Sequence, residues 1–290
     1  MGQIRDWVVR IALAASLSLV AYFMIAALGV RFGLWGVAMG LGTLTIRIGP
    51  LLAFGVLALG VIAVLMSLLI RPMRGSALAL AALVLPAALV GGLLQFRSQA
   101  QAVPPIHDIS TDLIEPPGFS AAVLQARAAQ GANSLDLLTK RVPDLNGRFG
   151  AAEGQLSIDL QRQAYGDVLP ISVPLAPMQA QQRALEIAKH LGWQVTRLEP
   201  ASAGLEAQVR SFWFGFVDDI AVRIRPGTAS DESVVDIRSV SRVGVSDVGA
   251  NAKRVRAFSE ALIAQSGGHR LQADGRETPT PCCAASPPPP

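Results

Sequence analysis

The sequence predicts an α+β protein in which three N-terminal transmembrane helices precede a two-layer sandwich, an antiparallel sheet of about four strands covered by helices. Three observations lead to this fold class. The first 95 residues contain three uncharged apolar runs of about 20 residues each. Residues 193–240 hold four segments in which apolar and polar side chains alternate with a period of two. Segments with helical periodicity flank these strands on both sides.

The composition indicates a membrane part joined to a water-soluble part. Hydrophobic residues make up 51% of the 290 residues and charged residues make up 16%, whereas a soluble domain has about 25% charged residues. Between positions 11 and 95 the only charged residues are arginines. The net charge is +4, but the basic residues are scattered, so we expect a lipid bilayer and no nucleic acid as a partner.

The membrane domain is expected to take residues 1–96, with spans at about 11–30, 51–70 and 76–95. Each run is long enough to cross a hydrocarbon layer of about 30 Å. Pro86 should kink the third span, which membrane helices tolerate. The first run exceeds the apolar region of a signal peptide and no A-x-A site follows it, so we expect an anchor that is not cleaved.

Arginine placement predicts how the spans are oriented. One side of the membrane receives Arg5, Arg10, Arg71 and Arg74, and the other receives Arg31 and Arg47. The positive-inside rule makes the first side cytoplasmic. The soluble domain then lies on the outer face, so we expect a multi-pass inner-membrane protein of a bacterium with a periplasmic domain.

A glycine-rich segment joins the first two runs. Gly29, Gly33, Gly36 and Gly40 recur at intervals of three or four residues, and such spacing lets helix backbones approach closely in lipid. Two interpretations remain open at this point. The first helix continues obliquely, or the segment lies at the interface with Trp35 at the headgroup level.

The soluble part begins after a proline-rich connector at 97–120, where proline pairs favour an extended path. The α+β domain follows at 121–266, of which 131–176 is expected to be irregular with short strands. The tail 267–290 ends in four prolines and is expected to be disordered. Its Cys282 and Cys283 are adjacent, so they form neither an unstrained disulfide nor a metal site. We expect no metal and no cofactor.

The expected order is helix, four strands joined by hairpins, helix. The first helix takes residues 177–191, and its buried face is expected to carry Met178, Ala184, Leu185, Ala188 and Leu191. The strands are expected at 193–198, 204–214, 219–225 and 234–240, and the last helix at 247–265 with Ser246 as its N-cap.

One face of this sheet should be solvated and the other covered by helices. On strand 234–240 the alternation places Asp236 and Arg238 on the solvated face. On strand 204–214 the same alternation places Trp213 in the core and Phe212 and Phe214 on the open face.

Two segments carry a family resemblance. The first is PPIHDISTDLIEPPGF at 104–119, and the second is FWFGFVDDIAVRIRP followed by VDIRSVSRVGVSDVGANAKRVRAF. Together they resemble the domain of unknown function 1499 family, in the branch found behind N-terminal membrane helices in Proteobacteria. The resemblance spans roughly residues 103–264 and includes Tyr165. It implies domain boundaries and a bacterial envelope setting, and it implies no catalytic residue, because the family has no established activity.

The densest polar cluster is the candidate binding site. It comprises Asp218, Asp219, Arg238, Arg242, Asp247, Asn251 and Arg254. One interpretation is an ion-pair network that locks the last helix to the sheet. The other is a site for an anion or a lipid headgroup, because free N–H groups at a helix start attract anions and arginine forks suit phosphate or carboxylate. Asp247 opposes the second interpretation, since its carboxylate would already occupy the helix start.

Catalytic residues are harder to identify in the sequence. The candidates are His107, Asp108 and Asp112, with which an envelope hydrolase would work. His107 and Asp108 are adjacent, however, which does not suit a hydrogen-bonded base and its orienting acid. The leading hypothesis is therefore a membrane-anchored binding or interaction module of the cell envelope, whose partner is an anionic ligand or another envelope protein. A hydrolase and a structural subunit of a membrane complex are the alternatives.

Overall fold

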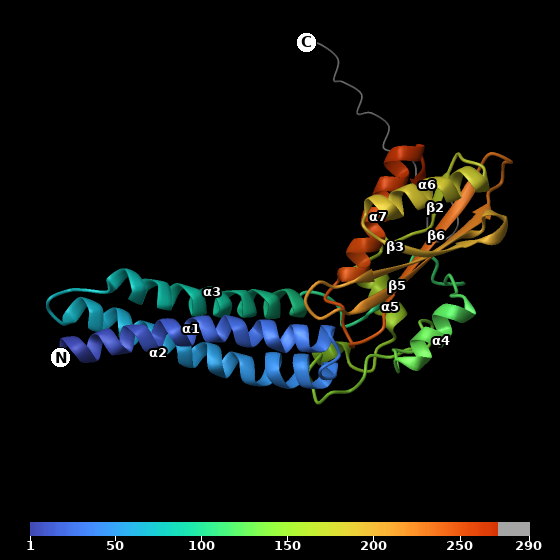
Figure 1. Ribbon diagram of the computed structural model, residues 1–290. Helices are drawn as coiled ribbons and strands as arrows, with labels where there is room; N and C mark the ends of the chain where they lie inside the picture. Colours follow the sequence, from blue (N-terminus) through green and yellow to red (C-terminus); the bar gives the residue numbers. More distant parts are fainter. Residues whose placement is uncertain (272–290) are drawn as a thin grey trace, which may run out of the picture. The chain divides into compact units, whose positions relative to one another are not determined.

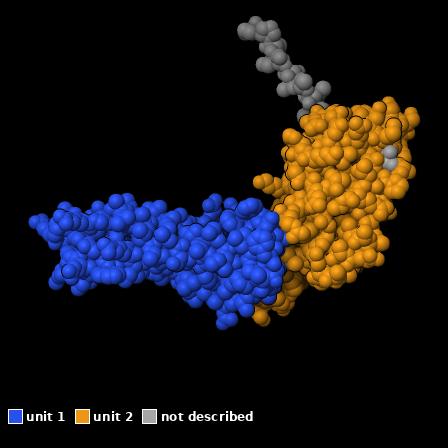
Figure 2. All heavy atoms as spheres, in the orientation of Figure 1, with its two compact units in different colours: residues 1–102, 211–216 blue, residues 103–210, 217–290 orange. Residues whose placement is uncertain are grey.

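The computed structural model describes residues 1–271, apart from the side chain of Ser202. Two compact units make up the chain, one of residues 1–102 with 211–216 and one of residues 103–210 with 217–290 (Figure 2). The rest of the predicted tail, including Cys282 and Cys283, lies outside the described residues.

Three long apolar helices form the first unit, as the sequence predicts. They are α1 (Gly2–Arg31), α2 (Gly49–Leu69) and α3 (Ser76–Gln101). Each is long and apolar enough to cross a membrane. The first interpretation of the glycine-rich segment, an oblique continuation of the first helix, is wrong, because α1 ends at Arg31 and Ala38–Ile48 is a π-helix (η1) that runs directly into α2.

Small residues bring these helices close together. The side chains of Ala12, Ala63 and Ala82 are completely buried. Ser16 Oγ donates a hydrogen bond of 2.6 Å to the carbonyl oxygen of Ala82, which joins α1 to α3. A Cβ atom at Gly60 would lie 3.0 Å from Leu83 Cα, so α2 and α3 need glycine there. Close backbone contact of this kind is typical of helix association in lipid, where the hydrophobic effect does not drive helices together.

The second unit is built on a seven-stranded antiparallel sheet, so the expectation of about four strands was too low. The strands are β1 (Asp108–Ser110), β2 (Ile171–Val173), β3 (Gln194–Glu199), β4 (Gly204–Arg210), β5 (Val217–Pro226), β6 (Ser233–Ser241) and β7 (His269–Arg270). Their order is β3-β4-β5-β6-β2-β7, and β1 also pairs with β6. The four predicted strands correspond to β3–β6. β7 lies inside the tail that was predicted to be disordered, so this prediction is wrong for residues 269–270.

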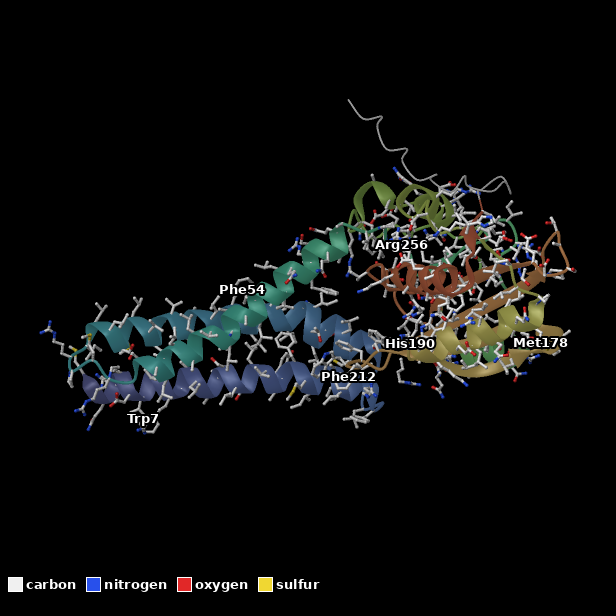
Figure 3. The ribbon with its side chains drawn as sticks, turned by 90° about the horizontal axis from the view of Figure 1, so that it is seen from above. Trp7, Phe54, Met178, His190, Phe212 and Arg256 are labelled. Carbon is white, nitrogen blue, oxygen red and sulfur yellow. The ribbon has the colours of Figure 1, made fainter. Side chains whose placement is uncertain are left out.

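One face of the sheet is covered by α6 (Pro177–His190) and α7 (Ala250–Ser266) (Figure 1). Their buried side chains pack on Ile220, Val222 and Ile237, and the Trp193 ring stacks on Phe258 with 5.2 Å between centroids. Met178 was predicted to be buried, yet it is 72% exposed at the start of α6 (Figure 3). The buried face of α6 instead consists of Ala180, Ala184, Ile187 and Ala188.

The opposite face is also covered, which corrects the prediction of a solvated face. Helix α4 (Ala121–Ala129) lies on this side of the sheet (Figure 1). Asp236 is completely buried and Arg238 is 5% exposed. Both side chains lie on the face that the alternation predicts. Residues 108–135, here called the covering segment, lie over this face, since Asp108 and Leu135 both accept hydrogen bonds from Arg238.

Two further segments differ from the sequence prediction. Residues 131–176 contain a 3-10 turn η2 (Gly150–Ala152) and the helix α5 (Ser157–Ala164) in addition to β2, and a second 3-10 turn η3 (Pro200–Ser202) follows β3. Strand β4 ends at Arg210 rather than at 214. Residues 211–216 therefore follow no strand alternation, and Trp213 is 49% exposed instead of lying in the core.

Candidate functional site

The polar face of the sheet holds a buried ion-pair cluster centred on Asp219. This carboxylate has no exposed surface. It accepts two hydrogen bonds from Arg242, at 2.9 Å from Nε and 2.7 Å from a terminal nitrogen, and one of 2.6 Å from Arg127 on α4. Gln208 donates a fourth at 3.1 Å. The carboxylate thus ties β4, β5, the end of β6 and α4 together.

Asp108 and Arg238 form a second buried pair on the same face. Arg238 donates to both carboxylate oxygens, at 3.0 Å and 2.7 Å, in the bidentate geometry that makes such pairs strong. The same guanidinium donates to the carbonyl oxygens of Pro117 and Leu135. Arg238 therefore fixes the covering segment to the sheet, and Asp108 is fully engaged.

Asp112 and Asp236 share two arginines near the end of β5. Arg223 lies 2.8 Å from Asp112 and 3.0 Å from Asp236, and Arg225 lies 2.7 Å from Asp236. Burial raises the pKa of Asp236, although both guanidiniums oppose that shift. Burial acts in the same direction on Asp112, but N–H bonds from Glu115 and Ile114 and the charge of Arg223 outweigh it and lower its pKa.

The remaining predicted residues lie on the helix-covered face. Arg254 pairs with Asp218 at 2.7 Å and donates to Ser239 Oγ at 2.9 Å. Asn251 is completely buried, accepts from Ser239 at 2.7 Å and donates to the carbonyl oxygen of His107 at 2.8 Å. This second cluster joins α7 to β5 and β6.

Asp247 occupies the start of α7. Its carboxylate accepts from the N–H groups of Gly249 at 2.8 Å and Asn251 at 2.7 Å. Burial raises the pKa of Asp247, while the two N–H bonds act against that shift. The N-cap residue of α7 is Gly249, so the prediction of Ser246 is wrong. Ser246 Oγ accepts from the N–H of Val248 ahead of the helix, and Asp247 supplies the carboxylate at the helix start.

The structure therefore divides the predicted binding residues among separate clusters. Arg238 and Arg242 lie on one face of the sheet in different ion pairs, and Arg254 lies on the other face. The three guanidiniums do not converge, and each has its own carboxylate.

The predicted catalytic residues are likewise separated by their partners. Asp108 binds Arg238 and Asp112 binds Arg223. His107 is 3% exposed, and its Nε2 contacts Lys140 Nζ at 2.7 Å. Among residues 1–271, no three His, Cys, Asp or Glu side chains gather in a way that could hold a metal ion.

Sequence reasoning missed two partners, Arg127 and Lys140. Arg127 lies on a short helix with a weak pattern, and Lys140 lies in the segment expected to be irregular. No local pattern marks either residue, because their partners Asp219 and His107 are far away in the chain.

Two cavities open on this unit. The larger, of about 630 Å³, is bounded by the loop after β1, the segment from α5 to β2, and the ends of β5 and β6. The smaller, of about 240 Å³, lies beside His107 and Lys140. Asp112 lines the larger cavity and His107 lines the smaller one, so the cavities include two of the predicted site residues.

Comparison with known proteins agrees with the resemblance noted in the sequence. No curated protein matches the chain. A family model described as "Protein of unknown function (DUF1499)" matches residues 108–262, which is more than half of the chain. The match runs from β1 into α7 and includes all the ion pairs on the polar face of the sheet. The chain therefore belongs to the DUF1499 family, whose function is unknown.

Proposed function

We propose that this chain is a membrane-anchored binding module of the bacterial cell envelope, and that the larger cavity holds its ligand. The observation that carries the proposal is the cavity itself. Its volume of about 630 Å³ lies in the range of pockets that enclose small molecules, roughly 300–1,000 Å³. The ion-paired carboxylates described above favour binding over hydrolysis as the role of the domain.

The walls of this cavity suit an amphipathic ligand. Leu113, Val168, Leu169 and Val234 give it a mainly apolar lining. Arg225, also in the lining, is 42% exposed at its side chain. An apolar body would replace water against the lining, at about 25 cal/mol per Å² of apolar surface buried. A polar group at one end of the ligand would meet the guanidinium.

The membrane anchor favours ligands of the envelope. The arginine distribution of the first unit favours a cytoplasmic N-terminus and a periplasmic soluble domain in the inner membrane. Amphipathic molecules with an acyl chain are abundant next to a bilayer. We therefore take a single-chain lipid or a similar amphipath as the ligand class.

Photo-crosslinking tests this proposal with the full chain in lipid nanodiscs. A dodecanoic acid that carries a diazirine is added and irradiated, and the modified peptides are identified by mass spectrometry. We expect modification of peptides from the cavity wall, residues 162–170 and 225–234. Val234→Trp fills the half-buried wall position on β6 and should remove this modification.

Leu198→Trp is the matched control. It adds the same side chain at a strand position that is 50% exposed and lies on β3, outside the cavity. The control should leave the modification unchanged. Labelling confined to the membrane helices, or labelling of the wall that Val234→Trp does not reduce, would contradict the proposal.

A further inference from the structure

The loop between β4 and β5 carries an exposed aromatic surface. This loop, residues 211–216, reads SFWFGF. Phe212 is 72% exposed and Trp213 is 49% exposed, and their rings meet edge to face with 5.1 Å between centroids. Phe214 and Phe216 stack on each other and are half-buried. Neighbouring large aromatic side chains that stay exposed mark a contact surface.

Hydrogen bonds within the loop hold it in one shape. The N–H of Ser211 donates to the carbonyl oxygen of Phe216 at 2.8 Å, and the N–H of Gly215 donates to the carbonyl oxygen of Ser211 at 3.1 Å. The N–H of Phe216 also donates to Ser211 Oγ at 2.9 Å. A closed loop therefore presents the aromatic rings, and little backbone order has to be gained when they bind a partner.

The loop packs on the end of the first membrane helix, within the same compact unit. Arg31 is the last residue of α1, and its guanidinium donates to the carbonyl oxygens of Ser211, at 3.0 Å, and of Phe212. The same guanidinium lies 5.8 Å from the centroid of the Phe212 ring. A Cβ atom at Gly215 would lie 3.2 Å from Arg31 Cγ, which shows how closely the loop approaches the helix end.

This end of α1 corresponds to the headgroup layer of a bilayer. The uncharged run 11–30 forms about 30 Å of helix, the thickness of the hydrocarbon layer. With that run in the hydrocarbon layer, Arg31 reaches the headgroups. Phe32 and Leu34 follow it in the chain and are 71% and 73% exposed. Phe212 lies at this end of the helices (Figure 3).

The apolar surface at this end carries no charge besides that of Arg31. Residues 32–46 and 211–216 contain no Asp, Glu, Lys or Arg. A charged protein partner therefore finds no matching group on the loop. The interfacial layer of a bilayer, in contrast, is where aromatic side chains of membrane proteins concentrate.

We propose that loop 211–216 inserts Phe212 and Trp213 into the interfacial layer of the bilayer beside the end of α1. The occupant of the aromatic surface is lipid, because the loop is uncharged and is held at the end of a membrane helix. Since β4 and β5 continue directly from the loop, the sheet domain gains a second attachment to the membrane besides the connector after α3. This inference goes beyond the proposed function and needs no ligand in the larger cavity.

Quenching of Trp213 fluorescence by brominated lipids tests the inference in the full chain. Trp7, Trp35 and Trp193 are replaced by phenylalanine, so that only Trp213 emits. The chain is reconstituted in nanodiscs of phosphatidylcholine that is brominated either near the headgroup or near the ends of the acyl chains. We expect bromines near the headgroup to quench Trp213 at least about twofold, and bromines near the chain ends to quench it less.

Two other single-tryptophan chains serve as controls. Trp7 is 64% exposed and lies at the opposite end of the helices from Phe212 (Figure 3), so it should be quenched if α1 spans the bilayer, whatever the loop does. Trp193 is 6% exposed in the core of the sheet domain and should not be quenched. Quenching of Trp7 without quenching of Trp213 would overturn the inference and leave the membrane anchor intact.

A substitution then assigns the quenching to the aromatic surface. Phe212→Gln removes the ring, keeps the backbone carbonyl that Arg31 binds and adds no charge, so quenching of Trp213 should fall at least about twofold. Leu198→Gln is the matched control at a position on β3 that is 50% exposed, and it should leave the quenching unchanged. Circular dichroism confirms that each variant is folded.

The remaining outcomes contradict the inference. Quenching that is as strong in Phe212→Gln as in Leu198→Gln would show that Phe212 does not insert. Trp213 that aqueous acrylamide quenches and brominated lipid does not would show that the loop faces water. Protection of Trp213 from both quenchers would show that protein, such as a second copy of the chain, covers the loop instead of lipid.

Discussion

Replacement of Arg242 by alanine distinguishes a structural role for the polar cluster from a binding role. Arg242 is 4% exposed and donates two hydrogen bonds to Asp219 and one of 3.0 Å to Gln130. Its removal leaves Asp219 completely buried with the bonds from Arg127 and Gln208. If the cluster is structural, Arg242→Ala must destabilise the domain.

The magnitude follows from the contacts that remain. Loss of one partner of a buried ion pair costs about 3–5 kcal/mol. Asp219 keeps its 2.6 Å bond to Arg127, so we expect the lower end, about 3 kcal/mol. For a domain of this size, that corresponds to a fall in melting temperature of about 6–12 °C. Asp219→Ala should cost more, because it leaves both Arg127 and Arg242 without a carboxylate.

Trp193 fluorescence in urea provides the assay. Trp193 is 6% exposed in the core of the sheet domain, and the chain's other tryptophans at positions 7, 35 and 213 can be replaced by phenylalanine. Arg183→Ala is the control, because its pair with Glu186 on α6 is at least 39% exposed on both sides and should contribute at most about 1 kcal/mol. Arg242→Ala that unfolds within 1 kcal/mol of the unmodified chain would refute a structural role.

Two further predictions concern pH and membrane topology. Burial and the charge of Lys140 lower the pKa of His107 to about 3, against about 6.5 in an unfolded chain. The unfolded state therefore takes up the proton first, and the domain should lose about 2 kcal/mol of stability between pH 7.5 and pH 5. The urea midpoint of Trp193 fluorescence measures this loss, and an equal loss in His107→Gln would show that another group is responsible. For topology, alkaline phosphatase fused after residue 270 should be active if the domain is periplasmic. Fluorescence of a protein that matures only in the cytoplasm, fused at the same place, would instead reverse the orientation.

Local patterns in the sequence were sufficient for the three membrane helices, for α6 and α7, and for four of the seven strands. The three membrane helices follow from uncharged runs, and β3–β6 follow from alternation over six to ten residues. Strands β1, β2 and β7 are two or three residues long and carry no period. β1 and β2 pair with β6, as in the pairing of Ile109 with Ser239, and β7 pairs with β2. These strands exist because a neighbouring strand offers them partners, and that pairing is not encoded locally.

Burial of the polar face also lay beyond sequence reasoning. Alternation places Asp236 and Arg238 opposite the helix-covered face whether that side meets water or another segment. The outcome depends on the covering segment, in which Asp108 pairs with Arg238 and Asp112 pairs with Arg223 and Arg225, the partners of Asp236. The same limit applies to the candidate site, because Lys140, the partner of His107, lies in a segment that has no recognisable periodicity.

The buried arginines of the polar face hold the covering segment on the sheet. Arg127 on α4 and Arg242 after β6 both donate to Asp219, and Arg238 donates to both carboxylate oxygens of Asp108. All three guanidiniums are buried, and a buried charge that loses its partner is costly. The covering segment therefore depends on the sheet for its charge partners, and the sheet depends on the covering segment for the burial of its polar face.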